Sequence, residues 1–233
     1  MDHSKKKVHV VGAGLAGSEC AFQLAEMGLQ VVLYEMRDQV LTPAHKTNQF
    51  AELVCSNSFG SMMNYSAPGQ LKWEARALNS LILQAATKAA IPAGMALGVD
   101  RQVFSETITK TLRSHPNIEI TSKVIEDLDQ VPRPTVIATG PLTHNSLAES
   151  LRNHFGDEFC YFFDAISPVI DAETINMDVA WKADRWGKGT NDYINCPLTK
   201  EQRPSLFQRI KDARKMERRE SEKDRDFFEC VMR

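Results

Sequence analysis

The sequence predicts an α/β fold, in which a parallel sheet is flanked by helices, on the basis of two observations. Short β-branched runs at residues 8–11 and 30–34 enclose a segment of helical periodicity at residues 17–27. Runs of this kind are typical of strands that are buried on both faces of a parallel sheet. A glycine-rich turn at residues 12–17 joins the first strand to the helix. The four pieces therefore form one right-handed strand–helix–strand crossover.

The later elements follow from the same patterns. Residues 42–70 are rich in Thr, Asn, Ser, Gly and Pro and are expected to form a long loop with short helical pieces. Helices are predicted at residues 71–90, at 100–114 with Asp100 as the N-cap, and at 142–155, and short strands at residues 118–120, 123–125 and 135–138.

The chain is expected to form two domains. Near residue 159 the composition becomes aromatic and apolar, which predicts a domain with the parallel sheet at residues 1–158 and the start of an inserted α/β subdomain at residues 159–233. Residues 200–225 combine many charges with apolar residues at helical spacing, which indicates a solvated amphipathic helix.

Composition excludes several classes of protein. The formal net charge is −2, so a nucleic-acid ligand would need a local basic face. No two of the five cysteines stand at CxxC spacing, which argues against a zinc site or a compact disulfide scaffold, and no metal site is predicted. The absence of a secretory signal and of a run of about 18 apolar residues predicts a cytoplasmic protein with reduced thiols and no membrane span.

The glycine turn predicts a dinucleotide site. It reads Gly12-Ala13-Gly14-Leu15-Ala16-Gly17. Gly12 permits the sharp turn, Gly14 lets the backbone approach a pyrophosphate, and Gly17 lets helix and strand pack closely. The N–H groups at the helix N-terminus then face the phosphates. The next strand ends in Glu35, close to the spacing of a ribose-binding acid. The alternative is a Rossmann-like fold without a ligand.

The choice of dinucleotide depends on a later strand. Glu35 does not distinguish FAD from NAD, but an apolar strand that runs into Ala138-Thr139-Gly140 favours FAD, because this ending recurs in flavoproteins close to the cofactor. Val124 is either a neighbour of the adenine or an ordinary core valine.

Cys55 lies in the long polar loop and is open to several interpretations. A thiolate there would be a nucleophile, a base or a redox partner of a flavin, and each role needs a lowered pKa or a nearby base. A single cysteine also often serves as a small buried hydrophobe. Cys20 lies inside the first helix and is expected in the core.

Five longer phrases accompany the glycine turn. They occupy residues 42–45, 50–58, 138–143, 163–168 and 191–200. Together with the turn they resemble the TrmFO family of folate- and FAD-dependent tRNA (uracil-5-)-methyltransferases over roughly residues 6–200. A sister family of flavoproteins, which modifies the wobble uridine of tRNA (GidA, or MnmG), shares the fold.

The resemblance implies a reaction and its residues. Family members transfer a one-carbon unit from 5,10-methylenetetrahydrofolate to the T-loop uridine at position 54 of tRNA, which gives ribothymidine. Reduced FAD supplies the electrons, and NAD(P)H reduces the flavin. Carried onto this chain, residues 12–17 hold the pyrophosphate, Glu35 the ribose, and Thr139 and Gly140 approach the cofactor. Cys55 matches one of the family's two functional cysteines.

The resemblance also raises a question about the C-terminus. Val231 stands where the family has its second functional cysteine, and Cys230 comes one residue early. Family members are nearly twice as long, which predicts a C-terminally truncated member. Three hypotheses therefore stay open: a tRNA methyltransferase, a FAD-binding remnant without turnover, and an RNA- or protein-binding fragment without a cofactor.

Overall fold

The computed structural model describes residues 7–42, 44–156, 170–184 and 191–214. The chain divides into two compact units, residues 1–167 and 168–233. The domain boundary predicted at residues 158–159 lies outside the described residues, as do Cys160, Cys230 and Val231. The predicted domain division therefore stays a prediction.

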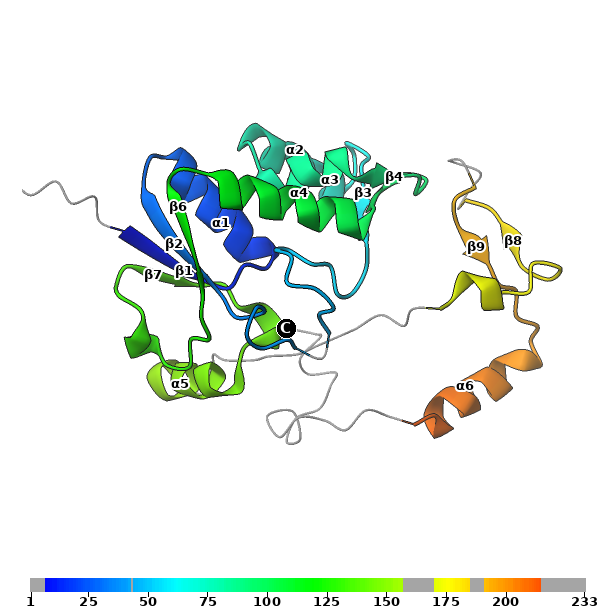
Figure 1. The fold of residues 1–233 in the computed structure, drawn as a ribbon. Helices are drawn as coiled ribbons and strands as arrows, with labels where there is room; N and C mark the ends of the chain where they lie inside the picture. Colours follow the sequence, from blue (N-terminus) through cyan, green and yellow to red (C-terminus); the bar gives the residue numbers. More distant parts are fainter. Residues whose placement is uncertain (1–6, 43, 157–169, 185–190, 215–233) are drawn as a thin grey trace, which may run out of the picture. The chain divides into compact units, whose positions relative to one another are not determined.

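The first unit contains a parallel sheet with the strand order β6-β2-β1-β7 (Figure 1). Its strands are β1 (Lys7–Val11), β2 (Gln30–Glu35), β6 (Ile118–Ser122) and β7 (Thr135–Ile137). The pairings β1–β2, β1–β7 and β2–β6 are all parallel, which confirms the predicted fold class. Because the strands run in one direction, the residues that follow β1, β2 and β7 meet at the same edge of the sheet.

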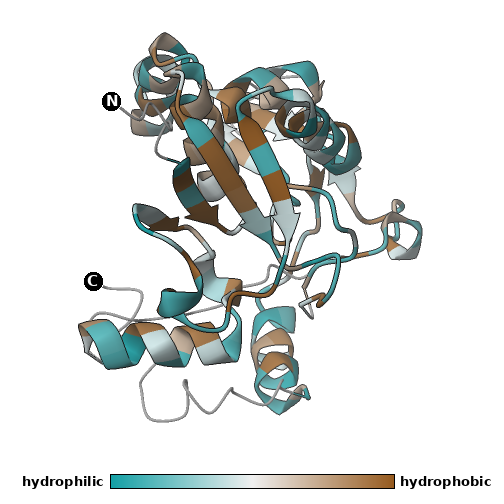
Figure 2. Ribbon diagram, turned by 60° about the vertical axis from the view of Figure 1, so that its left-hand side comes forward, coloured by the Kyte–Doolittle hydropathy of each residue, from teal (hydrophilic) through white to brown (hydrophobic). Residues whose placement is uncertain are grey.

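Helices cover both faces of this sheet (Figure 1). On one face lie α1 (Leu15–Glu26), α3 (Leu81–Lys88) and α4 (Arg101–Ser114), and on the other lies α5 (Asn145–Phe155). Successive side chains of a strand point to opposite faces. Val10 accordingly packs into the main core with the first three helices, whereas Val11 packs with Ile125 and Leu147 on the α5 side. Figure 2 shows the apolar residues along these strands.

Smaller elements complete the described residues. A three-stranded antiparallel sheet has the order β3-β5-β4, with β3 at Ser58–Ser61, β5 at Ala96–Val99 and β4 at Ala90–Ile91. Helix α2 spans Ala67–Ala77, and short 3-10 helices span Leu128–Gln130 and Gly140–Leu142. The second unit contains a 3-10 turn at Ala172–Thr174, a hairpin of β8 (Trp181–Lys182) and β9 (Ile194–Asn195), and α6 (Gln202–Asp212). Of the charged helix predicted at residues 200–225, the structure confirms α6, which ends at Asp212 and is exposed along its length; residues 215–225 lie outside the described residues. No described helix is long and apolar enough to cross a bilayer.

The prediction of a single helix at residues 71–90 is wrong, because the helix is interrupted between α2, which ends at Ala77, and α3, which begins at Leu81. Asn79 adopts a left-handed backbone conformation with φ of 59°, and the hydroxyl of Ser80 caps α3. The Glu19 carboxylate of α1 accepts hydrogen bonds from Ser80 Oγ at 2.9 Å and from the next two backbone N–H groups. The break therefore depends on a residue about sixty positions away, which local periodicity does not include.

Two other predicted boundaries differ from the structure. The predicted strand at residues 123–125 is absent, because β6 ends at Ser122 and only the N–H of Lys123 continues the ladder, to the carbonyl of Glu35 at 3.0 Å. The helix predicted from residue 142 begins at Asn145, after the 3-10 turn. Asp100, in contrast, caps α4 as predicted and accepts two backbone hydrogen bonds at 2.9 Å.

Candidate functional site

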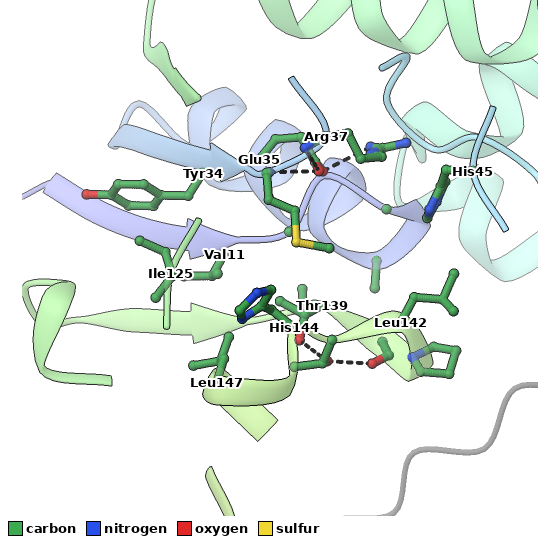
Figure 3. A pocket seen from close by; sticks show the side chains of 18 of the residues that line it. Val11, Tyr34, Glu35, Arg37, His45, Ile125, Thr139, Leu142, His144 and Leu147 are labelled. Atoms are coloured by element: carbon green, nitrogen blue, oxygen red, sulfur yellow. Dashed lines mark hydrogen bonds and ion pairs between the residues drawn. The ribbon is translucent and has the colours of Figure 1, made fainter. Parts of the chain in front are cut away.

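A cavity of about 320 Å³ lies at the edge of the sheet where β1, β2 and β7 end. Figure 3 shows side chains from these strand ends, and from the loops that follow them, converging on it. In open α/β sheets this edge is where ligands bind. The volume falls within the range of small-molecule sites.

The glycine turn forms one wall of the cavity. Gly12 leaves β1 with φ of +96°, a conformation that favours glycine. A Cβ on Gly17 would lie 1.8 Å from the carbonyl oxygen of Gly12, so this close approach also requires glycine. A Cβ on Gly14 would meet nothing within 4 Å and would instead enter the space that Gly14 lines. The first N–H groups of α1, which have no intrahelical partners, begin at this point.

Glu35 places a buried carboxylate on the same wall. Its Oε2 accepts hydrogen bonds from the N–H of Ala13 at 2.8 Å and from Nη2 of Arg37 at 2.9 Å, and its Oε1 accepts the N–H groups of Met36 and Arg37. Burial alone would raise the pKa of Glu35, but the Arg37 guanidinium and these backbone donors hold the pKa below its ordinary value. The carboxylate is therefore ionised at neutral pH.

The long loop after β2 contributes a second acid, Glu52. Its carboxylate accepts the N–H groups of Lys46 and Thr47, at 2.9 and 3.0 Å, and the Thr47 hydroxyl at 2.8 Å. Burial opposes ionisation of Glu52, but these hydrogen bonds lower its pKa below the ordinary value. His45 lines the cavity beside Glu52, and its Nδ1 lies 2.7 Å from the Thr42 hydroxyl. The loop is thus folded against the cavity by its own side chains.

The end of β7 closes the opposite wall. The hydroxyls of Thr139 and Thr143 lie 2.6 Å apart, and Thr143 also donates to the carbonyl of Gly140 at 2.7 Å. His144 follows and lines the cavity, with its Nδ1 buried and without a hydrogen-bond partner among the described residues.

One end of the cavity is apolar. Val11, Ile125 and Leu147, all at most 4% exposed, lie close to the His144 ring there (Figure 3). The cavity therefore offers an apolar compartment, an ionised acid and a helix N-terminus in succession. This order of surfaces suits an aromatic base, a sugar and a phosphate group.

The structure brings most of the predicted site residues together. Those that line the cavity are Gly12, Gly14, Leu15, Ala16, Glu35, Thr139 and Gly140. Ala13 and Gly17 do not line it, but Ala13 donates its N–H to Glu35 and Gly17 allows the turn to close. The neighbours of Val124, Lys123 and Ile125, line the cavity, whereas Val124 does not. The ligand roles assigned to these residues stay predictions.

Cys55 does not line the cavity, although the nearby Glu52 and Val54 do. It is half-buried, and its carbonyl accepts a hydrogen bond from Nη2 of Arg101 at 2.8 Å. Cys20 is partly buried and packs against the main core as predicted, and burial raises the pKa of its thiol. A thiol of that kind is a poor nucleophile.

Sequence reasoning missed seven polar residues of the cavity. They are Tyr34, Arg37, His45, Glu52, Lys123, Thr143 and His144. His45 and Glu52 lie within the sequence phrases that carry the family resemblance, so these phrases could have indicated them as site residues. Among the described residues, no group of three or more His, Cys, Asp or Glu side chains is placed to hold a metal ion.

Comparison with known proteins identifies relatives along almost the whole chain. The sequence profile of the family described as Glucose inhibited division protein A matches residues 7–233. The chain is 64% identical over 227 residues to the Methylenetetrahydrofolate--tRNA-(uracil-5-)-methyltransferase TrmFO of Bdellovibrio bacteriovorus, which covers 97% of this chain and 51% of the relative. Proteins of the same name from Natranaerobius thermophilus and Aquifex aeolicus are 45% and 44% identical, with 97% of this chain and 52% and 51% of the relatives covered. The chain spans about half the length of the curated relatives it matches.

Proposed function

We propose, for a chain that belongs to the Glucose inhibited division protein A family, that the cavity binds FAD and that the chain takes part in folate-dependent C5-methylation of a tRNA uridine. The observation that carries the cofactor assignment is the glycine turn beside an ionised acid. The space that a Cβ on Gly14 would fill lies at the N-terminus of α1, and Glu35 lines the same cavity.

The residues present fit FAD at each part of the cavity. Gly14 and the first N–H groups of α1 would hold the pyrophosphate, and Glu35 would accept the ribose hydroxyls. The apolar end at Val11 and Ile125 would hold the adenine, and the buried Nδ1 of His144 lies at that end. Bound FAD would supply the electrons that convert a methylene group into a methyl group.

Cys55 is the proposed nucleophile towards tRNA. C5 of uracil becomes a carbon nucleophile only after a thiolate has added to C6, because the addition places the electron pair of the C5–C6 double bond on C5. The one-carbon donor would be 5,10-methylenetetrahydrofolate and the reductant NAD(P)H, as the resemblance implies. The similarity to relatives named for methylenetetrahydrofolate and tRNA (uracil-5-)-methylation supports this assignment.

The test begins with the purified chain. Visible flavin absorbance that remains after gel filtration is expected, and a colourless protein that takes up no added FAD would overturn the cofactor assignment. The second step offers the chain methylenetetrahydrofolate, NAD(P)H and tRNA that lacks the T-loop methyl group, and measures ribothymidine. Flavin without methylation would indicate a FAD-binding chain without turnover, and modification at the wobble uridine would indicate the sister chemistry.

Cys55→Ala tests the nucleophile. Methylation is expected to stop while FAD stays bound, because Cys55 does not line the cavity. Cys20→Ala is the matched control, since it removes a thiol that packs against the core, and it should retain methylation. Ribothymidine formation by Cys55→Ala would exclude the covalent role.

A further inference from the structure

Arg37 is a buried cation to which the proposed chemistry gives no role. Its side chain is 2% exposed. The guanidinium donates Nη2 hydrogen bonds to Oε2 of Glu35 at 2.9 Å and to the carbonyl of Ala13 at 3.2 Å, and an Nη1 hydrogen bond to the carbonyl of Gln49 at 2.6 Å. Arg37 thus contacts three separate segments: the end of β2, the glycine turn and the long loop.

The carbonyl of Ala13 is where these segments meet. Besides Arg37, it accepts the hydroxyl of Ser18 at 3.2 Å and the N–H of Ala51 at 2.8 Å. Ala51 is fully buried and adopts φ of 51°, so the loop is held firmly at this point. The turn that faces the proposed pyrophosphate site is therefore joined to the loop both directly and through Arg37.

We infer that Arg37 is a positioning residue for the cofactor: it fixes the Glu35 carboxylate in the cavity wall and ties the loop at Gln49 to the glycine turn. This inference rests on the proposed FAD site. An arginine suits the task because its planar guanidinium offers donors on separate nitrogens in a fixed geometry, whereas an ammonium group donates from a single nitrogen.

The same contacts predict the choice of nucleotide. An arginine close to the ribose-binding acid accommodates the 2′-phosphate in NADP-binding sites. Here Nη1 of Arg37 donates to the carbonyl of Gln49, and Nη2 donates to Glu35 and to the carbonyl of Ala13; Glu35 itself would repel a phosphate. The site is therefore expected to select a ribose with a free 2′-hydroxyl.

The test compares Arg37→Met and Arg37→Lys with the wild-type chain after removal of flavin. Dissociation constants are measured for FAD and for an analogue whose adenosine ribose lacks the 2′-hydroxyl. The wild type should prefer FAD by about tenfold or more, the effect of one hydrogen bond to a charged group. Arg37→Met should bind FAD at least about tenfold more weakly and lose this preference, and Arg37→Lys should fall between the two. A merely structural role would weaken binding of both nucleotides equally and leave their ratio unchanged.

Thr109→Val is the matched control for the loop. The hydroxyl of Thr109 accepts the N–H of Phe50 at 2.8 Å, so this variant loosens the loop without touching Glu35. Amide hydrogen exchange of residues 46–52 should slow when FAD binds to the wild type, and this protection should be lost in Arg37→Met. In Thr109→Val the amide hydrogens of residues 46–52 should exchange faster than in the wild type, both with and without FAD. This variant should nevertheless keep the preference for FAD over the deoxy analogue.

Three results would overturn the inference. They are an unchanged FAD preference in Arg37→Met, tighter FAD binding by that variant, and loss of the preference in Thr109→Val as well. Tighter binding would mean that Nη2 competes with the ribose for Oε2 of Glu35. If Arg37→Met does not fold, the test relies on Arg37→Lys. The positioning role is then refuted if Arg37→Lys prefers FAD over the deoxy analogue as strongly as the wild type does. A wild-type chain that binds no FAD would instead refute the proposed function.

Discussion

Replacing Glu35 by glutamine should destabilise the first unit by several kcal/mol, although the two side chains have nearly the same shape. Each oxygen of the Glu35 carboxylate accepts two hydrogen bonds. A glutamine amide has one acceptor oxygen, so whichever way it turns, its NH₂ group faces two donors. The side chains of Arg37 and Glu35 are 2% and 8% exposed, so the guanidinium would lose its counter-charge in a buried site. Breaking a buried pair in this way costs about 3–5 kcal/mol.

Urea unfolding, followed by circular dichroism, measures this difference. Glu119→Gln is the matched control, because Glu119 pairs with Lys7 at 2.6 Å but the two side chains are 60% and 52% exposed. An exposed pair contributes at most about 1 kcal/mol. In thermal unfolding the Glu35→Gln midpoint should fall by roughly 2–4 °C for each kcal/mol lost. Equal stability losses in the two variants would refute the reasoning that Glu35 and Arg37 form a buried, fully bonded pair.

Acid stability, the glycine turn and the cap of α4 can be tested in the same way. Because the folded pKa of Glu35 lies below the ordinary value of 4.5, its contribution is complete above that pH and is lost as the pH falls through the folded pKa. The difference in unfolding free energy between wild type and Glu35→Gln should therefore be constant near neutral pH and shrink below about pH 4.5; a difference that grows in acid would contradict it. Gly14→Val should abolish FAD binding, measured by flavin absorbance, with little change in stability, since its side chain would enter the cavity. Gly17→Ala should instead destabilise the fold in urea, since its Cβ would lie 1.8 Å from the Gly12 carbonyl oxygen; the reverse pattern would invalidate this view of the turn. Asp100→Ala should cost about 1 kcal/mol through loss of the α4 cap, and an unchanged urea midpoint would show that the cap contributes nothing.

The parts of the fold that depend on local chemistry could be predicted from the sequence. The βαβ unit follows from the β-branched strands and the three glycines, and the start of α4 follows from the capping carboxylate of Asp100. The break between α2 and α3 was missed because its sequence contains neither glycine nor proline, although Asn79 and Ser80 are residues typical of a helix end and of an N-cap. Its N–H groups are satisfied by Glu19 of another helix, and the spatial neighbour of a segment is not encoded in its periodicity.

The residues of the candidate site that belong to a local motif could likewise be predicted from the sequence, and those that depend on tertiary contacts could not. The glycines and Glu35 belong to a motif of fixed spacing, so their positions along the chain indicated their place at the sheet edge. Arg37 makes two of its contacts with the backbone carbonyls of Ala13 and Gln49. A backbone carbonyl can belong to any residue type, so no sequence pattern predicts which carbonyls Arg37 contacts. His144 lines the cavity as the residue before α5, which begins three residues after the 3-10 turn ends at Leu142. The sequence placed this boundary incorrectly.

The loop contact at Ala51 bears on how a cysteine outside the cavity could serve chemistry beside it. The N–H of Ala51 is bonded to the carbonyl of Ala13 in the glycine turn at 2.8 Å. Cys55 follows four residues later, and four fully extended residues span at most roughly 14 Å. Cys55 is therefore tethered close to the point where the loop is bonded to the turn, although it is not part of the cavity wall. Residues that line the cavity on the same loop, Glu52 and Val54, lie between the two points. Under the proposed function, Glu52 and Val54 would face the cofactor while Cys55 stays outside the cavity. A thiol in that position would not be covered by a nucleotide bound in the cavity, as the proposed attack on tRNA requires.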